Sequence, residues 1–379
     1  MSQQARLLAA NHTVELLLKR NDELSETVST VTRMLHSTSR KREVLSILNT
    51  FRPDVVHVHN IYPSLGPAVH LACQEARIPL VMTVHNYRLR CPNGLMFTEG
   101  SRCMRCLPGN YANAVAHHCL PSKKQTLAYA SVLWIHRYVL RLENRVSFFL
   151  CPSSFVRNLI VGWGIPPARV LAIPNFVYPR TDADPGLGSF GVFVGRLSQE
   201  KGVHVLLDAL RIANDPPFRI IGDGPMAARL RDRAARLGLR QTVFLGRLAS
   251  DRVDEALRDA RFLVIPSLGD ENCPIAALEG LAHGRPLLVT SRGGLPELVQ
   301  EDNGLICRAG DAHDLAKGID KLMMDDAFCQ QAGARSLRAS RSQFGPEEHL
   351  ARLEAAYRAC VANPSAPGHP GDESDHRLG

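Results

Sequence analysis

The sequence predicts an α/β protein of two domains, each built around a parallel sheet. Short apolar runs typical of buried strands alternate with helical patterns along almost the whole chain, and this alternation indicates parallel strands with helices on the faces of the sheet. The 379 residues suffice for two domains, and 45% hydrophobic with 22% charged residues is the composition of a soluble globular protein. Binding residues are therefore expected at the carboxyl ends of the strands.

The net charge narrows the class of partner. A formal charge of +8 favours acidic partners, namely nucleotides, phospholipid surfaces or anionic glycans. No basic stripe interleaved with aromatic residues occurs, which argues against nucleic acid as a partner. The sequence shows neither a bilayer-spanning apolar run nor the apolar core of an export signal, so a cytoplasmic location is expected. Ten cysteines in such a chain favour reduced thiols or a metal site over a disulfide framework.

The first half opens with residues 5–18, which begin as a helix and become strand-like at 12–18. Residues 19–42 are polar and basic and are expected to form a loop followed by a helix. Further helices are expected around 44–51, 65–76 and from 123 onward, and strands at 54–59, 78–86, 147–153 and 170–175.

Histidines stand at the ends of two of these strands. His59 closes the strand at 54–59, and His85 with Asn86 closes the strand at 78–86, which is followed by a long loop. Each histidine is as readily explained as a hydrogen-bonded polar residue at a strand end as by a functional role. His85 is the preferred functional candidate because its strand is the more continuous.

The long loop, residues 91–119, contains four cysteines. Cys103 and Cys106 form a C-x2-C pair, and Cys91 and Cys119 lie at similar distances on either side. Four thiolates so spaced could enclose a tetrahedral structural Zn²⁺ and staple a loop that has little core of its own. Because only one such pair is present, reduced or disulfide-paired cysteines are the alternative.

The basic helix that begins at Lys123 also has two interpretations. Its apolar residues lie mostly on one side, which predicts a helix facing the core of the first domain. Trp134 and Tyr138 stand beside lysines and arginines, which is the pattern of a helix at a membrane surface. The core-facing interpretation is preferred.

In the second half, a predicted strand ends at Gly195 and is followed at once by Arg196. Lys201 comes five residues later, just before Gly202. The glycines let the backbone approach a ligand closely. Two cations at the start of a helix are the groups that a diphosphate leaving group needs. The alternative is a pair of solvated surface cations beside an ordinary turn.

Two further turns could bring the backbone close to a ligand. Gly222 and Gly224 form a lone Gly-x-Gly after a strand, which is weak evidence for phosphate binding, and Arg247 follows a strand whose tail could meet a base. Strands are expected at 190–195, 218–221, 242–246, 261–266, 285–290 and 303–307, and helices from 203, at 311–324 and at 346–360.

The stretch from Ser267 to Glu297 carries two acids on one strand-to-helix unit. Pro274 suits the first turn of a helix that ends at Gly284, so Glu271 lies at the helix entry and Glu279 on its body. Eight helical residues rise about 12 Å, close to the length of a nucleoside-diphosphate sugar. The helix N-terminus offers free N–H groups to a diphosphate, with one acid for sugar hydroxyls and the other for ribose hydroxyls.

The chain is expected to divide at a polar, Gly/Pro-rich linker. The expected parts are an acceptor-side domain at 1–180, a donor-side domain at 181–345, a helix at 346–362 that crosses back to the first domain, and a disordered tail at 363–379.

Five segments of the second half occur together in one order. They are Gly195-Arg196-Leu197-x3-Lys201-Gly202, Gly222-Asp223-Gly224-Pro225, Phe244-Leu245-Gly246, Glu271-x7-Glu279 and Gly293-Gly294-Leu295-Pro296-Glu297. In this combination the chain resembles the retaining nucleotide-sugar glycosyltransferases of family 4, which have the GT-B fold of two facing Rossmann-like domains. The likeness extends upstream through segments 53–59, 83–86 and 173–175 and so covers nearly the whole chain. The His85 segment with its cysteine loop is similar to a bacterial subgroup associated with cell-surface glycans.

The resemblance implies roles for matching residues. Arg196 and Lys201 would cradle the diphosphate, Glu279 would bind the ribose, and His85 would contact the donor sugar near the reacting carbon. Glu271 would hold the donor sugar together with the backbone at Asn272, Cys273, Pro274 and Ile275. The expected catalytic residues are thus His85, Arg196, Lys201 and Glu271. In such enzymes the leaving diphosphate deprotonates the acceptor on the same face, so no separate nucleophile is needed. No Asp-x-Asp metal motif occurs where a metal-dependent transferase would need one, and no catalytic cofactor is implied beyond the nucleotide sugar, which carries UDP or GDP.

One departure from the family concerns the start of the chain. Members open with a strand of the type Arg-Ile-Leu-x-Val and a Gly-Gly loop, whereas residues 6–14 here match the helix end and second strand that follow. This favours either a start assigned too late or a truncated, impaired protein that only binds nucleotide sugars.

The leading hypothesis is transfer of a hexosyl unit to a glycan or lipid-linked acceptor in cell-surface polysaccharide synthesis, with peripheral contact at the inner face of the membrane. A GT-B enzyme of another reaction, such as a disaccharide synthase or phosphorylase, is the further alternative; nothing resembles a lysine site for pyridoxal phosphate.

Overall fold

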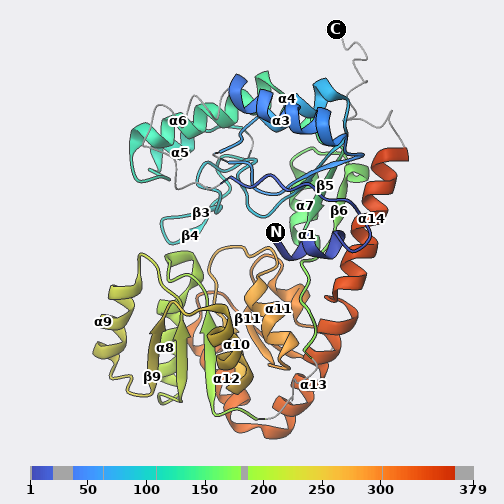
Figure 1. The fold of residues 1–379 in the computed structure, drawn as a ribbon. Coiled ribbons are helices and arrows are strands. Elements are labelled where there is room, and N and C mark those ends of the chain that lie inside the picture. Colours follow the sequence, from blue (N-terminus) through green and yellow to red (C-terminus); the bar gives the residue numbers. More distant parts are fainter. Residues whose placement is uncertain are drawn as a thin grey trace. The chain divides into compact units, whose positions relative to one another are not determined.

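The computed structural model describes residues 2–19, 37–62, 64–107, 109–180, 187–300 and 302–362. The described residues form two compact units (Figure 1). Unit 1 takes in residues 1–96, 104–173 and 350–379, and unit 2 takes in 97–103 and 174–349. No helix within the described ranges is long and apolar enough to cross a bilayer.

Unit 1 is built on a four-stranded parallel sheet in the order β1-β2-β5-β6. Its strands are β1 (Val56–Val58), β2 (Leu80–Thr83), β5 (Phe148–Cys151) and β6 (Val170–Ala172). Each lies inside a predicted strand but is shorter, because only the middle residues find a partner in the sheet. The predicted helices at 44–51 and 65–76 are confirmed as α3 (Thr38–Phe51) and α4 (Ala68–Ala76), and α7 (Ser154–Gly162) precedes the last strand.

The N-terminal expectation is half correct. Residues 2–8 form helix α1 (Ser2–Leu8), but the strand expected at 12–18 is wrong. Residues 13–19 have no regular structure, and Leu16 and Leu18 are exposed. A strand exists only where a neighbour accepts its ladder of hydrogen bonds, and the described sheet contains no partner for this segment. Residues 20–36 of the predicted loop lie outside the described residues.

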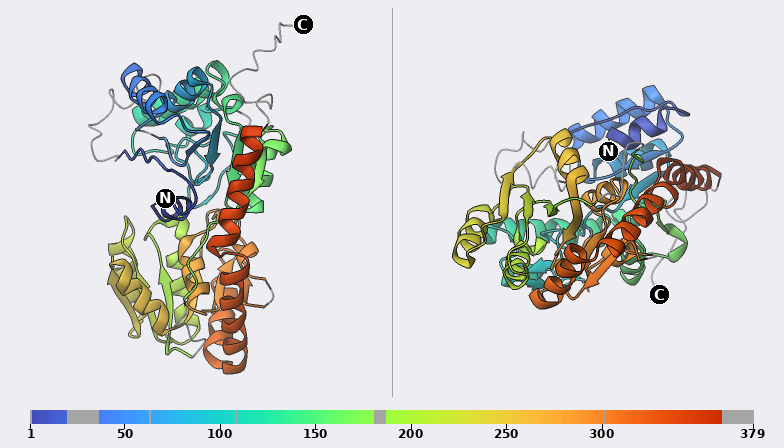
Figure 2. Two further views of the ribbon diagram at one scale, coloured as in Figure 1. Left: turned by 45° about the vertical axis from the view of Figure 1, so that its right-hand side comes forward. Right: turned by 90° about the horizontal axis from the view of Figure 1, so that it is seen from below.

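Helix α14 (Pro346–Ala362) belongs to unit 1 from Leu350 onward. It buries Leu353, Ala356 and Cys360 against the Val81 and Leu150 side chains of the sheet. The prediction that the C-terminal helix returns to the first domain is therefore confirmed; the helix is drawn in red in Figures 1 and 2.

The four cysteines of the loop do not form the expected zinc site. Cys91 packs against the main core of unit 1, Cys106 and Cys119 lie in a smaller apolar cluster, and Cys103 belongs to unit 2. No group of three or more metal-ligating side chains occurs within the described residues. Spacing along the chain suggested convergence, but the folded loop distributes Cys91, Cys103 and the Cys106–Cys119 cluster over different places. The loop instead contributes the hairpin β3 (Phe97–Thr98) and β4 (Ser101–Arg102) and the short helix α5 (Ala112–Ala116).

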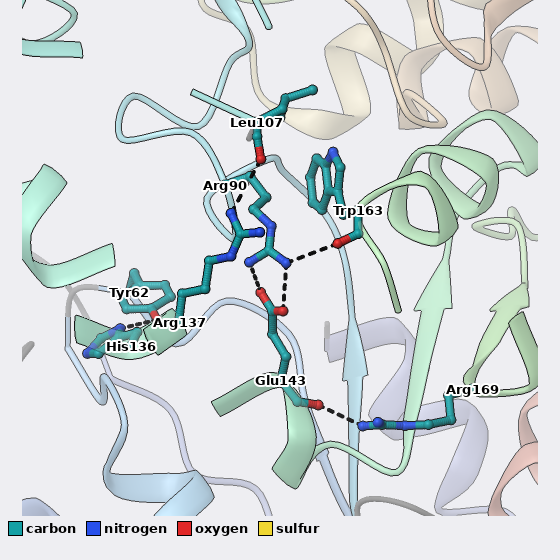
Figure 3. Close-up of polar contacts among 8 residues, drawn as sticks. All are labelled: Tyr62, Arg90, Leu107, His136, Arg137, Glu143, Trp163 and Arg169. Atoms are coloured by element: carbon teal, nitrogen blue, oxygen red, sulfur yellow. Dashed lines mark hydrogen bonds and ion pairs between the residues drawn. The ribbon is translucent and has the colours of Figure 1, made fainter. Parts of the chain in front are cut away.

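A buried ion pair ties the segment after β2 to the rest of unit 1 (Figure 3). Arg90 is 2% exposed, and its guanidinium binds both carboxylate oxygens of Glu143, with Nη2 2.7 Å from Oε2. Nη2 also donates to the Trp163 carbonyl oxygen at 3.4 Å, and Arg169 Nη2 donates to the Glu143 carbonyl oxygen at 2.6 Å. Arg90 is thereby the anchor of the loop that begins at His85.

Unit 2 contains a six-stranded parallel sheet in the order β12-β11-β10-β7-β8-β9. Its strands are β7 (Phe190–Val194), β8 (Phe218–Ile221), β9 (Thr242–Gly246), β10 (Ala260–Ile265), β11 (Leu287–Thr290) and β12 (Gly304–Cys307). All six predicted strands are confirmed, and two of them have the predicted bounds. These strands could be predicted from the sequence because each is a strongly apolar run bounded by turn residues.

Helices cover both faces of this sheet. Phe262 and Val264 of β10 contribute to one core, and Leu263 and Ile265 to the other, as the alternation of strand side chains requires. The first core is covered by α8 (Val203–Ile212), α9 (Ala227–Leu237) and α12 (Ala312–Met324), and the second by α10 (Ser250–Asp259), α11 (Ile275–Ala282) and α13 (Asp326–Ser342). Helices α9, α10 and α13 were not predicted: about half the residues of α9 and α10 are charged, and α13 is rich in small and polar residues, so none shows a strong apolar pattern.

Candidate active site

The loops after β7 and β8 are joined by backbone contacts in which only glycine fits. A Cβ on Gly222 would lie 1.8 Å from the Gly195 carbonyl oxygen, and Gly222 has φ +139°. A Cβ on Gly224 would lie 2.5 Å from the Leu197 carbonyl oxygen. Leu197 N also donates to the Asp223 carbonyl oxygen at 2.9 Å. These glycines let two neighbouring strand ends approach each other, so their first role is structural.

The loop after β7 also joins the loop after β10. The carbonyl oxygen of Glu200 accepts from Leu268 N at 2.8 Å and from Gly269 N at 3.0 Å. Gly202 has φ +69°, and a Cβ there would lie 2.0 Å from the Pro266 carbonyl oxygen. This packing places Lys201 beside the Ser267–Glu297 stretch.

Glu271 is the meeting point of three loops. Lys201 Nζ lies 2.7 Å from its Oε1, and Ser267 Oγ donates to the same oxygen at 2.6 Å. Gly294, in the loop after β11, donates its backbone N–H to the Glu271 carbonyl oxygen at 2.7 Å. The carboxylate thus lies at the carboxyl ends of three adjacent strands, where α/β sheets bind their ligands.

Helix α11 follows directly. Pro274 is its N-cap instead of lying within its first turn, and Gly284 ends it with φ +69°. The helix spans Ile275–Ala282, inside the stretch predicted between Pro274 and Gly284, and its first N–H groups lie next to the Glu271 loop. Asn175 Nδ2 donates to the Cys273 carbonyl oxygen at 2.8 Å and holds the approach to the helix. Burial raises the pKa of the Cys273 thiol to about 12, so this cysteine is not a nucleophile at neutral pH.

Glu279 lies half-buried on the body of α11. Burial, and then the charge of Asp254, raise the pKa of its carboxyl group above the ordinary glutamate value. Asp254 on α10 has its Oδ1 2.8 Å from His283 Nε2, and it also forms an ion pair with Arg180. The sequence pattern did not reveal Asp254 or His283, because only folding brings α10 beside α11.

Arg196 and Arg247 are exposed after β7 and β9. Of the two predicted cradle cations, Lys201 is the one that pairs with Glu271. Asp270, adjacent to Glu271, is paired with Arg102 of the β3–β4 hairpin at 2.5 Å, a contact that sequence spacing did not indicate.

His85 lies in unit 1, after β2, and its Nε2 lies 2.8 Å from His59 Nδ1. The ring has an exposed edge, but protein atoms around it limit its hydration and lower its pKa to about 4. His85 is therefore neutral at physiological pH and can hydrogen bond without carrying charge.

Two family models match the chain. Residues 2–175 match the glycosyl transferase 4-like domain, and residues 188–338 match the glycosyl transferases of group 1. An uncharacterised glycosyltransferase of Methanocaldococcus jannaschii is 35% identical over 295 residues, which cover 75% of this chain and 70% of that protein. The chain belongs to the group 1 glycosyltransferases.

Other relatives of this glycosyltransferase differ in how much of their length is matched. A second uncharacterised glycosyltransferase of the same archaeon is 32% identical over 209 residues, and the match spans 55% of this chain and only 58% of that protein. The glycogen synthase of Mycobacterium tuberculosis is 28% identical over 349 residues, covering 89% of this chain and 76% of the synthase. A Bacillus subtilis glycosyltransferase named for teichuronic acid biosynthesis is 23% identical over 328 residues, covering 84% of this chain and 75% of the relative.

Solved structures show the same fold at low sequence identity. Anabaena HepE in complex with UDP and glucose has a TM-score of 0.63 and 18% identity, covering 84% of this glycosyltransferase and 81% of HepE. The sucrose-phosphate synthase of Thermosynechococcus elongatus has a TM-score of 0.69 and 16% identity, covering 95% and 92% of the two chains. The two parallel sheets of this glycosyltransferase therefore belong to the GT-B fold predicted from the sequence.

Replacing Glu279 with glutamine is expected to weaken binding of the donor nucleotide by about 1.5–3 kcal/mol, because a charged hydrogen-bond acceptor is lost. Since the pKa of Glu279 is raised, binding to the unmodified protein should weaken as the pH falls through that raised pKa, and the glutamine variant should lack this dependence. Calorimetric titration with UDP and GDP across pH measures both effects. Glu255→Gln, on the exposed surface of α10, is the matched control. Equal affinities for Glu279→Gln and the unmodified protein would contradict the ribose role.

Proposed function

We propose that this glycosyltransferase moves a hexosyl unit from a UDP- or GDP-sugar to a glycan or lipid-linked acceptor, with retention of configuration, in the synthesis of cell-surface polysaccharide. The observation that carries the proposal is the cluster of Lys201, Ser267 and Glu271 beside the N-terminus of α11. A cation, a carboxylate and free helix N–H groups are the three groups that a nucleoside-diphosphate sugar requires.

Each group has a distinct task in the proposed site. Lys201 and Arg196 bind the diphosphate, and the N-terminal amides of α11 contribute further donors to it. Glu271 accepts hydrogen bonds from the hydroxyls of the donor sugar, with the backbone from Asn272 to Ile275. Glu279 accepts from the ribose hydroxyls eight residues further along the chain.

The reaction needs no protein nucleophile. The bond between the anomeric carbon and the diphosphate oxygen breaks, and the acceptor hydroxyl oxygen bonds to that carbon from the same face. The hydroxyl proton passes to an oxygen of the leaving diphosphate. Negative charge grows on the diphosphate as the bond breaks, so cations aimed at it stabilise the transition state. Lys201 and Arg196 supply this charge, which supports a reaction that is independent of added metal.

Names of similar proteins support the choice of donor and product. HepE binds UDP and glucose, which supports a UDP-sugar donor. Glycogen synthase and the teichuronic acid glycosyltransferase are relatives that act in polysaccharide synthesis.

The direct test is release of UDP or GDP from a panel of labelled nucleotide sugars by the purified chain, with and without a chelator. One donor should be turned over, with unchanged rate in the chelator and with the α-anomer retained in product analysis. Binding of a nucleotide sugar without any turnover would contradict catalysis and leave a binding protein. Loss of activity in the chelator would contradict metal independence, and an inverted product would contradict retention.

A second proposal concerns the membrane and is carried by the outer face of α6 (Lys123–Trp134) and the π-helical turn η1 (Ile135–Val139). Its inner residues Val132 and Leu133 are buried, as predicted for a core-facing helix. Four large apolar side chains on the other side are exposed by 43–61%: Leu127, Trp134, Tyr138 and Val139. Lys123 and Lys124 are exposed at the start of the same helix. Exposed aromatic residues beside lysines suit the surface of an anionic bilayer.

We expect Trp134→Ser to reduce binding to vesicles of phosphatidylglycerol at least about threefold, because the largest apolar anchor is lost. Sedimentation with vesicles measures the bound fraction, and neutral phosphatidylcholine vesicles should bind little of either protein. Ile306→Ser, a change at an apolar residue 48% exposed in unit 2, is the matched control. Equal binding of the Trp134 and Ile306 variants would overturn the proposal.

A further inference from the structure

Three imidazole rings lie in a row at the carboxyl ends of β1 and β2. His57 and His59 are two residues apart and project from the same side of the chain, and their ring centroids are 4.4 Å apart. The His85 ring comes next, with its centroid 5.1 Å from that of His59 and 18° between the ring planes. His59 Nδ1 also lies 2.8 Å from His85 Nε2.

That last distance constrains the protons of both rings. A hydrogen bond between two ring nitrogens requires a proton on one of them and a lone pair on the other. A neutral imidazole carries a single N–H, so the state of Nε2 determines the state of Nδ1 in the same ring. His59 Nδ1 therefore decides whether the outer nitrogen of His85, Nδ1, donates or accepts. The lowered pKa of His85 keeps the ring neutral, which makes this choice binary.

The other end of the row is held by α14. The Tyr357 hydroxyl lies 2.7 Å from His57 Nδ1, and Thr83 Oγ1 lies 2.7 Å from His57 Nε2. Gln4 Nε2, an amide donor, lies 3.4 Å from the same Nδ1, so this nitrogen is the acceptor, and the Tyr357 hydroxyl, whose pKa is raised by burial, donates to it. His57 Nε2–H then donates to Thr83. This arrangement fixes the plane of the His57 ring, on which His59 stacks.

We propose that His59 is a positioning residue that holds His85 in one tautomer and one ring orientation, so that His85 presents a single kind of hydrogen-bonding group to a substrate. His59 acts through His85 and does not touch the substrate. The inference rests on the proposed function, because it assumes that His85 contacts a substrate of the transferase. It goes further in assigning a task to a second histidine and a reason for the row of rings.

The first test reads the tautomer without using activity. In the full chain labelled with ¹⁵N-histidine, ring nitrogen shifts show which nitrogen carries the proton, and His85→Gln identifies the His85 signals. We expect one tautomer of His85 in the unmodified protein and an averaged mixture in His59→Ala. Tyr357→Phe should change the His57 signals and leave His85 in its single tautomer. A mixture in the unmodified protein, or an unchanged His85 in His59→Ala, would overturn the proposal.

The second test uses turnover. We expect His59→Ala to lower kcat by about tenfold to 100-fold while KM for the donor stays within about threefold, as for other residues that orient a functional histidine. His59→Asn keeps a hydrogen-bonding group near the position of Nδ1 and should recover most of the rate. His313→Ala, at an exposed position of α12, is the control for histidine loss. Equal impairment of the alanine and asparagine variants would contradict a positioning role. If the unmodified chain turns over no nucleotide sugar, the proposed function fails, and the nitrogen shifts alone decide the role of His59.

Discussion

Replacing Lys201 with methionine is expected to lower kcat by a factor of about 100 to 1,000, with little change in KM for the donor. Lys201 Nζ lies 2.7 Å from Glu271 Oε1, and the two side chains are only 27% and 13% exposed, so water screens the lysine charge weakly. The charge of a leaving diphosphate is larger in the transition state than in the bound donor. A cation that stabilises this added negative charge contributes to kcat more than to binding.

The measurement is steady-state kinetics with the nucleotide sugar that the donor panel identifies, together with calorimetric binding of the free nucleotide. Lys201→Met keeps the length of the side chain and removes its charge, and Lys201→Arg should retain part of the rate. Lys317→Met, at an exposed position of α12, is the matched control and should leave kcat unchanged. The pattern should be opposite to that of Glu279→Gln, which is expected to affect nucleotide binding. Equal losses of binding in the two variants would contradict the separate roles of Lys201 and Glu279.

Replacing Arg90 with methionine is expected to reduce the free energy of unfolding of unit 1 by about 3–5 kcal/mol. The Arg90 guanidinium is 2% exposed and binds both oxygens of Glu143, whose side chain is 20% exposed (Figure 3). Methionine fills much of the volume but leaves the Glu143 carboxylate without its cation. The cost is therefore that of an unpaired and largely buried charge, and removal of both charges should cost much less.

Tryptophan fluorescence during urea unfolding reports on unit 1 alone, because both tryptophans of the chain, Trp134 and Trp163, lie there. The double variant Arg90→Met with Glu143→Leu should recover most of the stability lost in Arg90→Met. Arg233→Met breaks an exposed ion pair with Asp208 in unit 2 and should leave the tryptophan transition in place. A double variant no more stable than Arg90→Met would show that shape, and not charge, makes Arg90 necessary.

Several elements followed directly from local pattern. β8 and β9 have the predicted bounds, and α11 lies between the predicted Pro274 and Gly284. Apolar runs bounded by glycine and proline specify such elements, because backbone geometry and burial act over a few residues. Predictions failed where the deciding contact was remote. Residues 12–18 have strand-like composition but no strand partner in the described sheet, and the four loop cysteines are spaced for a metal but do not converge on one point.

The candidate site shows the same division at the level of chemistry. Residue types and spacing were sufficient to name Lys201, Glu271 and Glu279, since a diphosphate and sugar hydroxyls demand those groups near a helix N-terminus. The pairing of Lys201 with Glu271 spans 70 residues, and the contact of His57 with Tyr357 spans 300. Such contacts depend on which strands are neighbours and which helix covers them, and the energy that selects them is distributed over the whole core. The local pattern thus names candidate functional groups, whereas the assembled sheets and helices determine which of them meet.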